Sequence, residues 1–441
     1  MLNFDFVENV RKAGVVGAGG AGFPTFVKVR QDINTLIANG AECEPLISKD
    51  KELMRTFAPE IIKGLELTGK AVSAKEIVIG IKEKNQAEIS ALKNNSGYRI
   101  KYCLMKDVYP AGDEFVLVYE ATGKLIPPAG IPIEIGCLVL NVETLYNIGR
   151  AVDGMPVTDK FITISGAVKN PGTFKIPLGT AISDCVELAG GATISDYAVL
   201  FGGAMMGELV TDASLPITKT TAGLIILPLE HQLVKRRLLP KKAVRTIGAS
   251  ACDQCYRCTE LCPRWLLGYD IQPHEVMRSL LFAAGEREEH FNRYSILCIE
   301  CNICSLYACP EDLDPKNICT WSKRELISRG LKVDKSRPVK AHPVRSGRQV
   351  PTPMLTRKLG LARYEEHAPF KKVDFHPERV RLPLKQHAGS AAVPVVNKGD
   401  TVSKGDIIAE IPNGMLGARI HASIDGIVEA VSESDIMLKR G

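Results

Sequence analysis

The sequence predicts a multidomain α/β protein in which four units follow one another along the chain. Three observations support this fold class. Strand-like and helix-like segments alternate, with glycines at the strand ends, through the first third of the chain. A strand, a Pro-Gly turn, a second strand and a short helix follow, and a helical region with eight clustered cysteines comes next. At 441 residues the chain is also too long for one hydrophobic core, because domains usually hold about 150 residues.

Residues 1–155 are predicted to form a Rossmann-like domain. An amphipathic segment at 4–13 leads into a glycine-rich turn, a strand at 35–41, a long helix at 50–68 and a strand at 76–81. This alternation is typical of a parallel sheet with helices packed on its faces.

Residues 156–240 are predicted to form a small β-grasp domain. Strands at 161–168 and 173–177 enclose a Pro-Gly turn, and a short helix at 182–189 follows them. The pattern then changes, and residues 241–335 form a helical, cysteine-rich region.

The last part of the chain divides into a linker and a β module. Residues 336–380 are punctuated by Pro, Lys and Arg and show no sustained periodicity, which indicates an extended linker. Residues 381–441 return to short strands with Gly turns, and the segments VNKGDTVSKGD and ASIDGIVEAV resemble the half-repeats of a biotinyl/lipoyl-type barrel-sandwich hybrid. No lysine occupies the turn at 423–426, where carrier domains bear their cofactor. We therefore expect a docking or structural module.

Composition and charge narrow the function classes. Aromatic residues make up 6% of the chain, which argues against base stacking, and the basic stretch 235–245 is more simply a solvated linker, so we expect no nucleic-acid partner. The sequence contains no apolar run of about 18 residues, and its N-terminal stretch lacks the apolar segment of a secretory signal. Clustered cysteines without such a signal are typical of metal sites in a reducing cytosol. We expect a cytoplasmic protein without a transmembrane segment.

Two cysteine runs carry the strongest chemical signal. Each has the pattern Cys-x2-Cys-x2-Cys followed by a Cys-Pro pair: Cys252, Cys255, Cys258 and Cys262 in the first run, and Cys298, Cys301, Cys304 and Cys309 in the second. Thiolates at i, i+3 and i+6 wrap one [4Fe–4S] cubane, and in two-cluster ferredoxins the fourth cysteine of a run binds the other cluster. We therefore assign Cys252, Cys255, Cys258 and Cys309 to one cluster, and Cys262, Cys298, Cys301 and Cys304 to the other.

Structural zinc is the main alternative for these cysteines, although zinc sites favour pairs of Cys-x2-Cys over such triplets. The spacing before Cys309 has one residue more than the spacing before Cys262. The scattered cysteines are predicted to fill cores as small apolar side chains: Cys43, Cys103, Cys137, Cys185 and Cys319. The cysteine pattern favours two iron–sulfur clusters, and therefore one-electron transfer as the function.

The glycine loop, residues 14–25, holds five glycines. Glycines let backbone N–H groups approach a phosphate closely and tolerate positive φ. This loop follows a helix, whereas a dinucleotide fingerprint follows a strand, so the glycines alone indicate no particular nucleotide. A purely structural use of the glycines stays open at this point.

The full string GAGGAGFPTxxxK resembles the flavin loop of the FMN-binding subunit of respiratory complex I, the 51-kDa family. Stretches at 39–45, 109–114 and 141–145 resemble the same family in the same order. The resemblance implies that FMN is held by Gly17, Gly19, Gly20, Gly22, Lys28, Asn39, Glu42, Tyr109, Gly112, Glu114, Asn141 and Thr144. It also implies an NADH site in which Phe23 stacks on the nicotinamide while Glu44 and Asp113 border the nucleotide. Ala18 and Ala41 stand where the family has an arginine and an acidic residue near the nucleotide, so FMN binding is better supported than NADH binding.

The domain order narrows this resemblance. A 51-kDa-like domain, a soluble-ligand-binding β-grasp (SLBB) domain and a two-cluster ferredoxin module together resemble the C subunit of Rnf complexes, but here the barrel-sandwich module comes last. This order, with the motifs at 202–207, 216–223 and 416–426, is similar to that of the cobalamin reductase family of propanediol-utilisation microcompartments.

Membership of that family implies an NADH-dependent reductase that passes electrons through FMN and two [4Fe–4S] clusters to cob(III)alamin or cob(II)alamin for coenzyme B12 recycling. Expected partners are then an adenosyltransferase and the shell of a bacterial microcompartment in the cytoplasm. The alternative is an electron-transfer adaptor that delivers NADH electrons to a protein partner, as a proline-reductase-type donor or an Rnf-like complex does.

Overall fold

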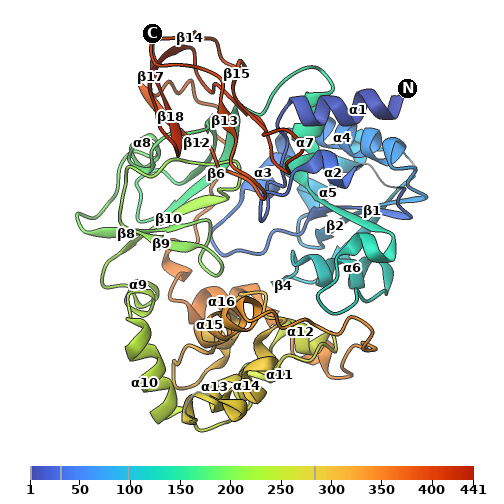
Figure 1. The fold of residues 1–441 in the computed structure, drawn as a ribbon, viewed down its shortest axis with the longest axis vertical. Coiled ribbons are helices and arrows are strands. Elements are labelled where there is room, and N and C mark those ends of the chain that lie inside the picture. The colour runs from blue at the N-terminus through green and yellow to red at the C-terminus, as the bar shows by residue number, and fades with distance from the viewer. Residues whose placement is uncertain (1, 30–31, 98, 283–284) are drawn as a thin grey trace.

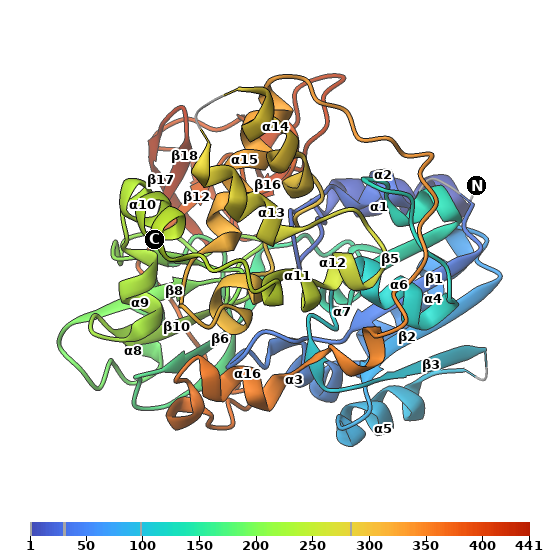
Figure 2. The same ribbon diagram turned by 90° about the horizontal axis from the view of Figure 1, so that it is seen from below.

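The computed structural model describes residues 2–29, 32–97, 99–282 and 285–441, and its units follow one long axis (Figure 1). Cysteine-rich helices lie at one end of this axis and the C-terminal β module lies at the other. A parallel-sheet domain and a β-grasp domain lie side by side between them. Seen from below, the cysteine-rich helices cover the junction between those two domains (Figure 2). Within the described ranges, no helix is long and apolar enough to cross a membrane.

The parallel-sheet domain is built on four strands in the order β3-β2-β1-β5, and all three pairings are parallel. Its elements are α1 (Leu2–Lys12), α2 (Thr25–Lys28), β1 (Thr35–Gly40), α3 (Lys49–Thr56), α4 (Ala58–Ala71), β2 (Glu76–Lys82), α5 (Gln86–Asn95), β3 (Ile100–Met105), β4 (Val108–Tyr109), α6 (Glu114–Thr122), η1 (Pro132–Ile135), β5 (Cys137–Asn141) and α7 (Val142–Ala151). Successive strand residues face opposite sides, so Leu36 and Ala38 join the core with α1, α4 and α7 while Ile37 packs with α6. Both faces of the sheet are therefore covered, as a parallel sheet requires.

The helix predicted over residues 50–68 is divided in two. Helices α3 and α4 separate at Phe57, and Pro59 lies in the first turn of α4. Proline is tolerated there because the first N–H groups of a helix have no partner, whereas inside one continuous helix its ring would clash with the preceding turn.

The β-grasp domain has a mixed sheet in the order β7-β6-β10-β8-β9. Its elements are β6 (Asp159–Gly166), β7 (Gly172–Pro177), α8 (Ile182–Leu188), β8 (Tyr197–Phe201), β9 (Glu208–Val210) and β10 (Gly223–Pro228). Strands β6 and β7 form the antiparallel hairpin that the Pro-Gly turn predicts, and β10 pairs parallel to β6. Ile164 and Phe174 of the hairpin pack in one core with Ile182 and Val186 of α8.

The cysteine module consists of short helices that connect the two cysteine runs. Its elements, with the preceding α9, are α9 (Gln232–Arg237), α10 (Lys241–Ala251), α11 (Arg257–Glu260), α12 (Pro263–Leu266), α13 (Pro273–Arg278), η2 (Ser279–Leu281), α14 (Glu286–Asn292), η3 (Arg293–Ser295), η4 (Cys304–Ala308) and α15 (Pro315–Ser328). Leu267 and Tyr269 of this module share a core with Leu117 of α6, so the module packs directly on the parallel-sheet domain.

The predicted linker packs against both sheet domains and contains short elements. These are η5 (Arg345–Gly347), β11 (Val350–Pro351), α16 (Thr352–Lys358) and η6 (Ala362–Tyr364). Strand β11 pairs antiparallel with β4, and the Phe370 ring lies 5.3 Å from that of Phe57 between centroids. The chain thus returns across the molecule before it reaches the C-terminal module.

The C-terminal module is a sandwich of two small antiparallel sheets, β12-β18-β17-β14 and β13-β15-β16. Its strands are β12 (Arg379–Pro383), β13 (Val393–Pro394), β14 (Thr401–Val402), β15 (Ile407–Glu410), β16 (Ile420–His421), β17 (Gly426–Val431) and β18 (Asp435–Arg440). The turn at 423–426 is held against the β-grasp domain, because buried Ser423 donates a hydrogen bond of 2.6 Å to the carbonyl oxygen of Leu178. A turn fixed in this way is part of a domain contact.

Candidate functional site

The candidate flavin site lies at the carboxyl edge of the parallel sheet. Strand β5 lies on the opposite side of β1 from β2, so the strand order reverses between β1 and β5. Ligands of open α/β sheets bind at the carboxyl ends of strands beside such a point. Asn39 and Asn141, the last residues of β1 and β5 to pair, are direct neighbours across it. Two amides predicted from the resemblance are thus brought together.

Both asparagines are held by hydrogen bonds. The Nδ2 atom of Asn39 donates to the carbonyl oxygen of Gly112 at 2.9 Å. The side chain of Asn141 caps α7 by accepting a hydrogen bond from the N–H of Glu143 at 2.9 Å, and its Nδ2 atom donates to Asp50 at 2.7 Å. The cap directs the N-terminus of α7 toward the site, where the helix dipole favours an anion.

The glycine loop lies beside the N-terminus of α7. The N–H of Ala18 donates to Thr144 Oγ1 at 3.0 Å, and the loop closes on itself through a 3.0 Å bond from the N–H of Gly17 to the carbonyl oxygen of Phe23. A Cβ atom at Gly19 would come within 3.0 Å of the Asn141 side chain, whereas one at Gly20 would meet no atom within 4 Å. Open space beside exposed backbone at a helix N-terminus suits a phosphate, so the loop fits FMN.

Another part of the site is formed around Lys28, which lies close to Phe23 and Glu114. The Nζ atom of Lys28 is 3.9 Å from the Glu114 carboxylate and 6.0 Å from the centroid of the Phe23 ring. Burial raises the pKa of Glu114, and Lys28 opposes that rise. Of the predicted glycines, Gly22 turns the loop with φ of 68° and faces residues 386–387 of the C-terminal module.

A network of buried ion pairs lies next to the site. The sequence analysis did not predict this network. Lys49 contacts Asp50 at 2.5 Å and Glu143 at 2.9 Å, and Lys160 of the β-grasp domain also pairs with Glu143. Glu42 accepts a hydrogen bond of 3.1 Å from the N–H of Asp50. No local pattern could identify this network, because its members are up to 118 positions apart, from 42 to 160.

The stability of the chain should depend on the proton held by Glu42. Burial and the neighbouring Asp50 raise the pKa of Glu42 from its ordinary value of 4.5 to about 8. Between those values the folded chain holds a proton that the unfolded chain releases, so this contribution to stability falls as the pH rises. A Glu42→Gln chain keeps the hydrogen-bond acceptor and loses this dependence. We expect the Tm of the wild type to fall relative to that of E42Q between about pH 4.5 and about pH 8 and to stay level with it above that range.

The matched control for E42Q is Glu433→Gln, because Glu433 is an exposed glutamate of the C-terminal module. Its Tm should follow that of the wild type at every pH. Parallel Tm curves for E42Q and the wild type would contradict the assignment of this proton to Glu42.

Three residues predicted to border the flavin or NADH also bind neighbouring domains. Glu44 accepts hydrogen bonds from the N–H groups of Met205 and Met206 of the β-grasp domain at 2.8 and 2.9 Å. Asp113 caps α6 and also pairs with Arg264 of the cysteine module at 2.8 and 3.1 Å. The hydroxyl of Tyr109 donates to the carbonyl oxygen of Cys301 at 2.8 Å. The site therefore lies where three domains meet.

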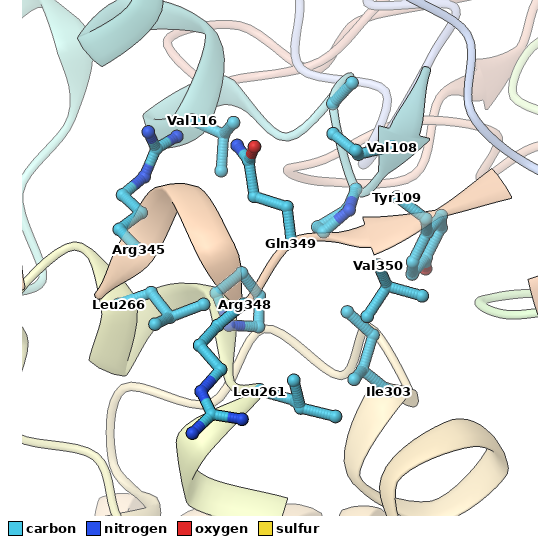
Figure 3. Close-up of a pocket in the computed structure, with 13 residues that line it drawn as sticks. Val108, Tyr109, Val116, Leu261, Leu266, Ile303, Arg345, Arg348, Gln349 and Val350 are labelled. Atoms are coloured by element: carbon cyan, nitrogen blue, oxygen red, sulfur yellow. The ribbon is translucent and has the colours of Figure 1, made fainter. Parts of the chain in front are cut away.

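A narrow crevice follows the contact between the parallel-sheet domain and the cysteine module (Figure 3). It is lined by Val108, Tyr109 and Val116, by Leu261, Leu266 and Ile303, and by linker residues 345 and 348–350. Its volume of about 20 Å³ is close to that of one water position. The two domains are thus closely packed where Tyr109 meets the cysteine module.

The eight run cysteines fall into two sets. Burial and the nearby thiols of Cys252, Cys255 and Cys309 raise the pKa of Cys258. These four form the Cys255 set. Burial and the thiols of Cys262 and Cys298 raise the pKa of Cys301, and Cys298, Cys301, Cys258 and Cys262 act in the same way on Cys304. We name Cys262, Cys298, Cys301 and Cys304 the Cys301 set, following the assignment that the spacing predicts, and the two sets adjoin because Cys258 also acts on Cys304.

The donor chemistry of both sets suits cationic clusters. Buried thiols that raise one another's pKa need positive charge before they become thiolates. Within the described ranges, no three His, Cys, Asp or Glu side chains converge closely enough for a single metal ion. A cubane accepts wider spacing, because each cysteine binds a different iron.

The backbone repeats one conformation in both runs. Residues two and four positions after the first cysteine have positive φ: Gln254 at 59° and Tyr256 at 71°, and Glu300 at 58° and Asn302 at 69°. Left-handed conformations cost non-glycine residues about 1–2 kcal/mol each. They turn amide groups toward sulfur, as the 3.4 Å bond from the N–H of Glu300 to Cys298 Sγ illustrates.

The additional residue before Cys309 is accommodated by a π-helical turn. Element η4 (Cys304–Ala308) is a π-helix, whereas the corresponding part of the first run begins with the α-helical turn of α11. A π-turn adds one residue per turn, and so Cys309 still reaches the Cys255 set. A further thiol, Cys319, is fully buried and hydrogen-bonds to Cys298, a role that its isolated position in the sequence did not indicate.

Comparisons with known proteins identify the same units. Family models match the Nuo51 FMN-binding domain over residues 10–150, the SLBB domain over 161–209, a 4Fe-4S dicluster domain over 251–314 and the RnfC barrel-sandwich hybrid domain over 363–441. The predicted fold class is thereby confirmed.

Two curated relatives match almost the whole chain. The cobalamin reductase PduS of Citrobacter freundii is 40% identical over 436 residues, which cover 98% of this chain and 96% of the relative. The cobalamin reductase PduS of Salmonella typhimurium LT2 is 41% identical over the same shares. Among solved structures, an NAD⁺-reducing [NiFe]-hydrogenase in the H2-reduced state matches with a TM-score of 0.49 and 20% identity, covering 75% of this chain and 62% of that one.

Proposed function

This chain belongs to the PduS family of cobalamin reductases, and from that premise we propose that it takes electrons from NADH at a bound FMN and passes them through two [4Fe–4S] clusters to the cobalt of cobalamin. Membership of the family makes the chain an oxidoreductase. The observation that carries the proposal is the hydrogen bond of 2.8 Å from Tyr109, in the flavin site, to Cys301, in the cysteine module. It joins the two redox units directly within one chain.

The glycine loop and the edge of the sheet would hold FMN. The exposed backbone at Gly19 and Gly20 would bind the phosphate with the N-terminus of α7, and Lys28 would add a positive charge. The isoalloxazine would lie against Asn39, Asn141, Thr144, Glu42, Tyr109, Gly112 and Glu114, with Gly17 and Gly22 shaping the loop. When bound, FMN supplies the conversion of one hydride, which carries two electrons, into single-electron transfers that iron–sulfur clusters accept.

The nicotinamide would stack on the ring of Phe23, beside Lys28. Glu44 and Asp113, which bind Met205 and Arg264, would form fixed walls of the nucleotide site. For each NADH oxidised, two cob(III)alamin molecules become cob(II)alamin and one proton goes to solvent. The PduS name of the relatives supports cobalamin as the acceptor. We further propose that the protein acts inside a propanediol-utilisation microcompartment and supplies reduced cobalamin to an adenosyltransferase.

Metal analysis tests the two-cluster assignment. After anaerobic reconstitution we expect about eight irons and eight acid-labile sulfides per chain. A Cys262→Ala chain should lose the cluster of the Cys301 set and keep about four irons in the Cys255 set. Cys185→Ala is the matched control, because Cys185 is buried in the β-grasp core and should leave all eight irons bound. Stoichiometric zinc, or loss of the cluster of the Cys255 set in Cys262→Ala, would contradict the assignment.

A further inference from the structure

The flavin side of the molecule contacts one cysteine set in particular. Tyr109 donates its hydrogen bond to the carbonyl oxygen of Cys301 at 2.8 Å. Asp113 binds Arg264, two residues after Cys262, at 2.8 and 3.1 Å, and the Arg264 guanidinium lies 3.6 Å from the centroid of the Phe115 ring. Both connections therefore end at ligands of the Cys301 set or beside them.

A third connection passes through the β-grasp domain. Glu44 accepts hydrogen bonds from the N–H groups of Met205 and Met206. The carbonyl oxygen of Met205 accepts a 3.0 Å bond from the side chain of Asn302, which lies between Cys301 and Cys304. This path also begins at the flavin site and ends at the Cys301 set.

The Cys255 set lies farther from the flavin side and closer to solvent. Cys255 is exposed and Cys252 is half-buried, whereas all four members of the Cys301 set are buried. Helix α12, which follows Cys262, lies between α6 and α11, which carries Cys258 (Figure 2). The two sets adjoin where the thiols of Cys258 and Cys304 interact.

We infer that electrons enter the cluster of the Cys301 set first and leave from the cluster of the Cys255 set, at the face that exposes Cys255. The inference rests on the proposed function, since it requires the flavin and both clusters. The rate of electron transfer between bound centres falls steeply with distance. A flavin beside Tyr109 therefore passes its electrons to the cluster of the Cys301 set first. A corrinoid is too large to enter the packed module and needs a cluster near the surface, and Cys255 is the one exposed cysteine of the two described sets.

Two single variants test this order with EPR. In Cys255→Ala, reduction of the flavin by NADH should produce the reduced-cluster signal of the remaining Cys301 set at the wild-type rate. In Cys301→Ala, the flavin should be reduced while the remaining cluster stays oxidised, or follows at least about ten-fold more slowly, although dithionite reduces it directly. The reverse pattern would overturn the order. If NADH leaves the flavin oxidised, the bound flavin is reduced instead by illumination in tricine buffer. This step distinguishes failure of the proposed NADH reaction from failure of the proposed order of the two clusters.

The release of iron from the wild-type chain tests whether the cluster of the Cys255 set is the one exposed to solvent. This test needs no substitution. With bathophenanthroline under anaerobic, oxidised conditions, half of the iron should leave in a fast phase from the Cys255 set. A single phase for all iron would overturn the assignment of the exposed cluster.

Hydroxocobalamin is the probe for the exit itself. Cys255→Ala should lose at least nine-tenths of the reduction rate. The competing exit is a cavity of about 300 Å³ that Cys298, Arg264 and Lys323 help to line, beside the Cys301 set. Cobalamin reduction by Cys255→Ala at the wild-type rate would move the exit to that cavity and overturn the inference.

Discussion

Replacing Gly20 with valine should weaken FMN binding at least about ten-fold without lowering the stability of the flavin-free chain. Gly20 is exposed at the tip of the glycine loop, and a Cβ atom there would meet no protein atom within 4 Å. The backbone of Gly20 has no positive φ, so valine introduces no left-handed strain. The only partner that the new side chain can displace is the ligand, because close approach of backbone to a phosphate depends on the missing Cβ.

The measurement is a fluorescence titration of the flavin-free chain with FMN, preceded by a thermal scan. Gly347→Val is the matched control, since a Cβ at Gly347 also meets nothing within 4 Å and its φ is ordinary. It should bind FMN as the wild type does, and iron–sulfur absorbance should be unchanged in both chains. Wild-type FMN affinity in G20V would show that the phosphate lies elsewhere, and a lower Tm would show that the loop has a structural role instead.

Periodicity predicted the sheets well. The parallel sheet follows from apolar strands that alternate with amphipathic helices, and the β-grasp hairpin follows from the Pro-Gly turn after residue 170. The prediction of one long helix at 50–68 was wrong at one place. The break at Phe57 depends on Pro59 and on tertiary packing, which hydrophobic periodicity does not report. The extended linker predicted at 336–380 contains short elements instead. Its strand β11 pairs with β4, about 240 positions earlier, and no local pattern in the sequence indicates that pairing.

The assignment of the eight cysteines to two clusters stays a prediction of their spacing, in which the fourth cysteine of each run is carried toward the other run. The π-turn at Cys304–Ala308 was not predictable, since one added residue can be accommodated in several ways. The resemblance to the 51-kDa family implies that Asn39, Asn141 and Thr144 share one site. In the structure these residues lie at the same edge of the sheet. The resemblance gave no sign of Lys160, whose ammonium reaches the carbonyl oxygen of Ala18 at 3.3 Å from another domain. Contacts between domains leave no periodic trace in a sequence.

Removing one ligand from each cysteine set should separate the two halves of the reaction. A Cys255→Ala/Cys301→Ala chain keeps the glycine loop, Phe23 and Lys28, so NADH should still bleach its bound flavin. Transfer onward should fail, because each remaining set has only three thiols for a cubane. Cys103→Ala/Cys185→Ala, which removes two cysteines outside both sets, is the matched control and should behave as the wild type. The loss in the first variant is expected to exceed about 100-fold in cobalamin reduction, with flavin bleaching within about two-fold of the wild type.

The most direct test of the central claim is the anaerobic, NADH-driven reduction of hydroxocobalamin, followed by absorbance after free flavin has been removed on a desalting column. The proposed function predicts that the wild type forms cob(II)alamin in a ratio of two per NADH, and that the Cys255→Ala/Cys301→Ala chain bleaches its flavin but leaves cobalamin oxidised. Cobalamin reduction at the wild-type rate by that variant would show that electrons bypass the clusters. A wild-type chain that oxidises NADH and reduces its clusters but leaves hydroxocobalamin unchanged would contradict the claim and favour an adaptor that serves a protein partner.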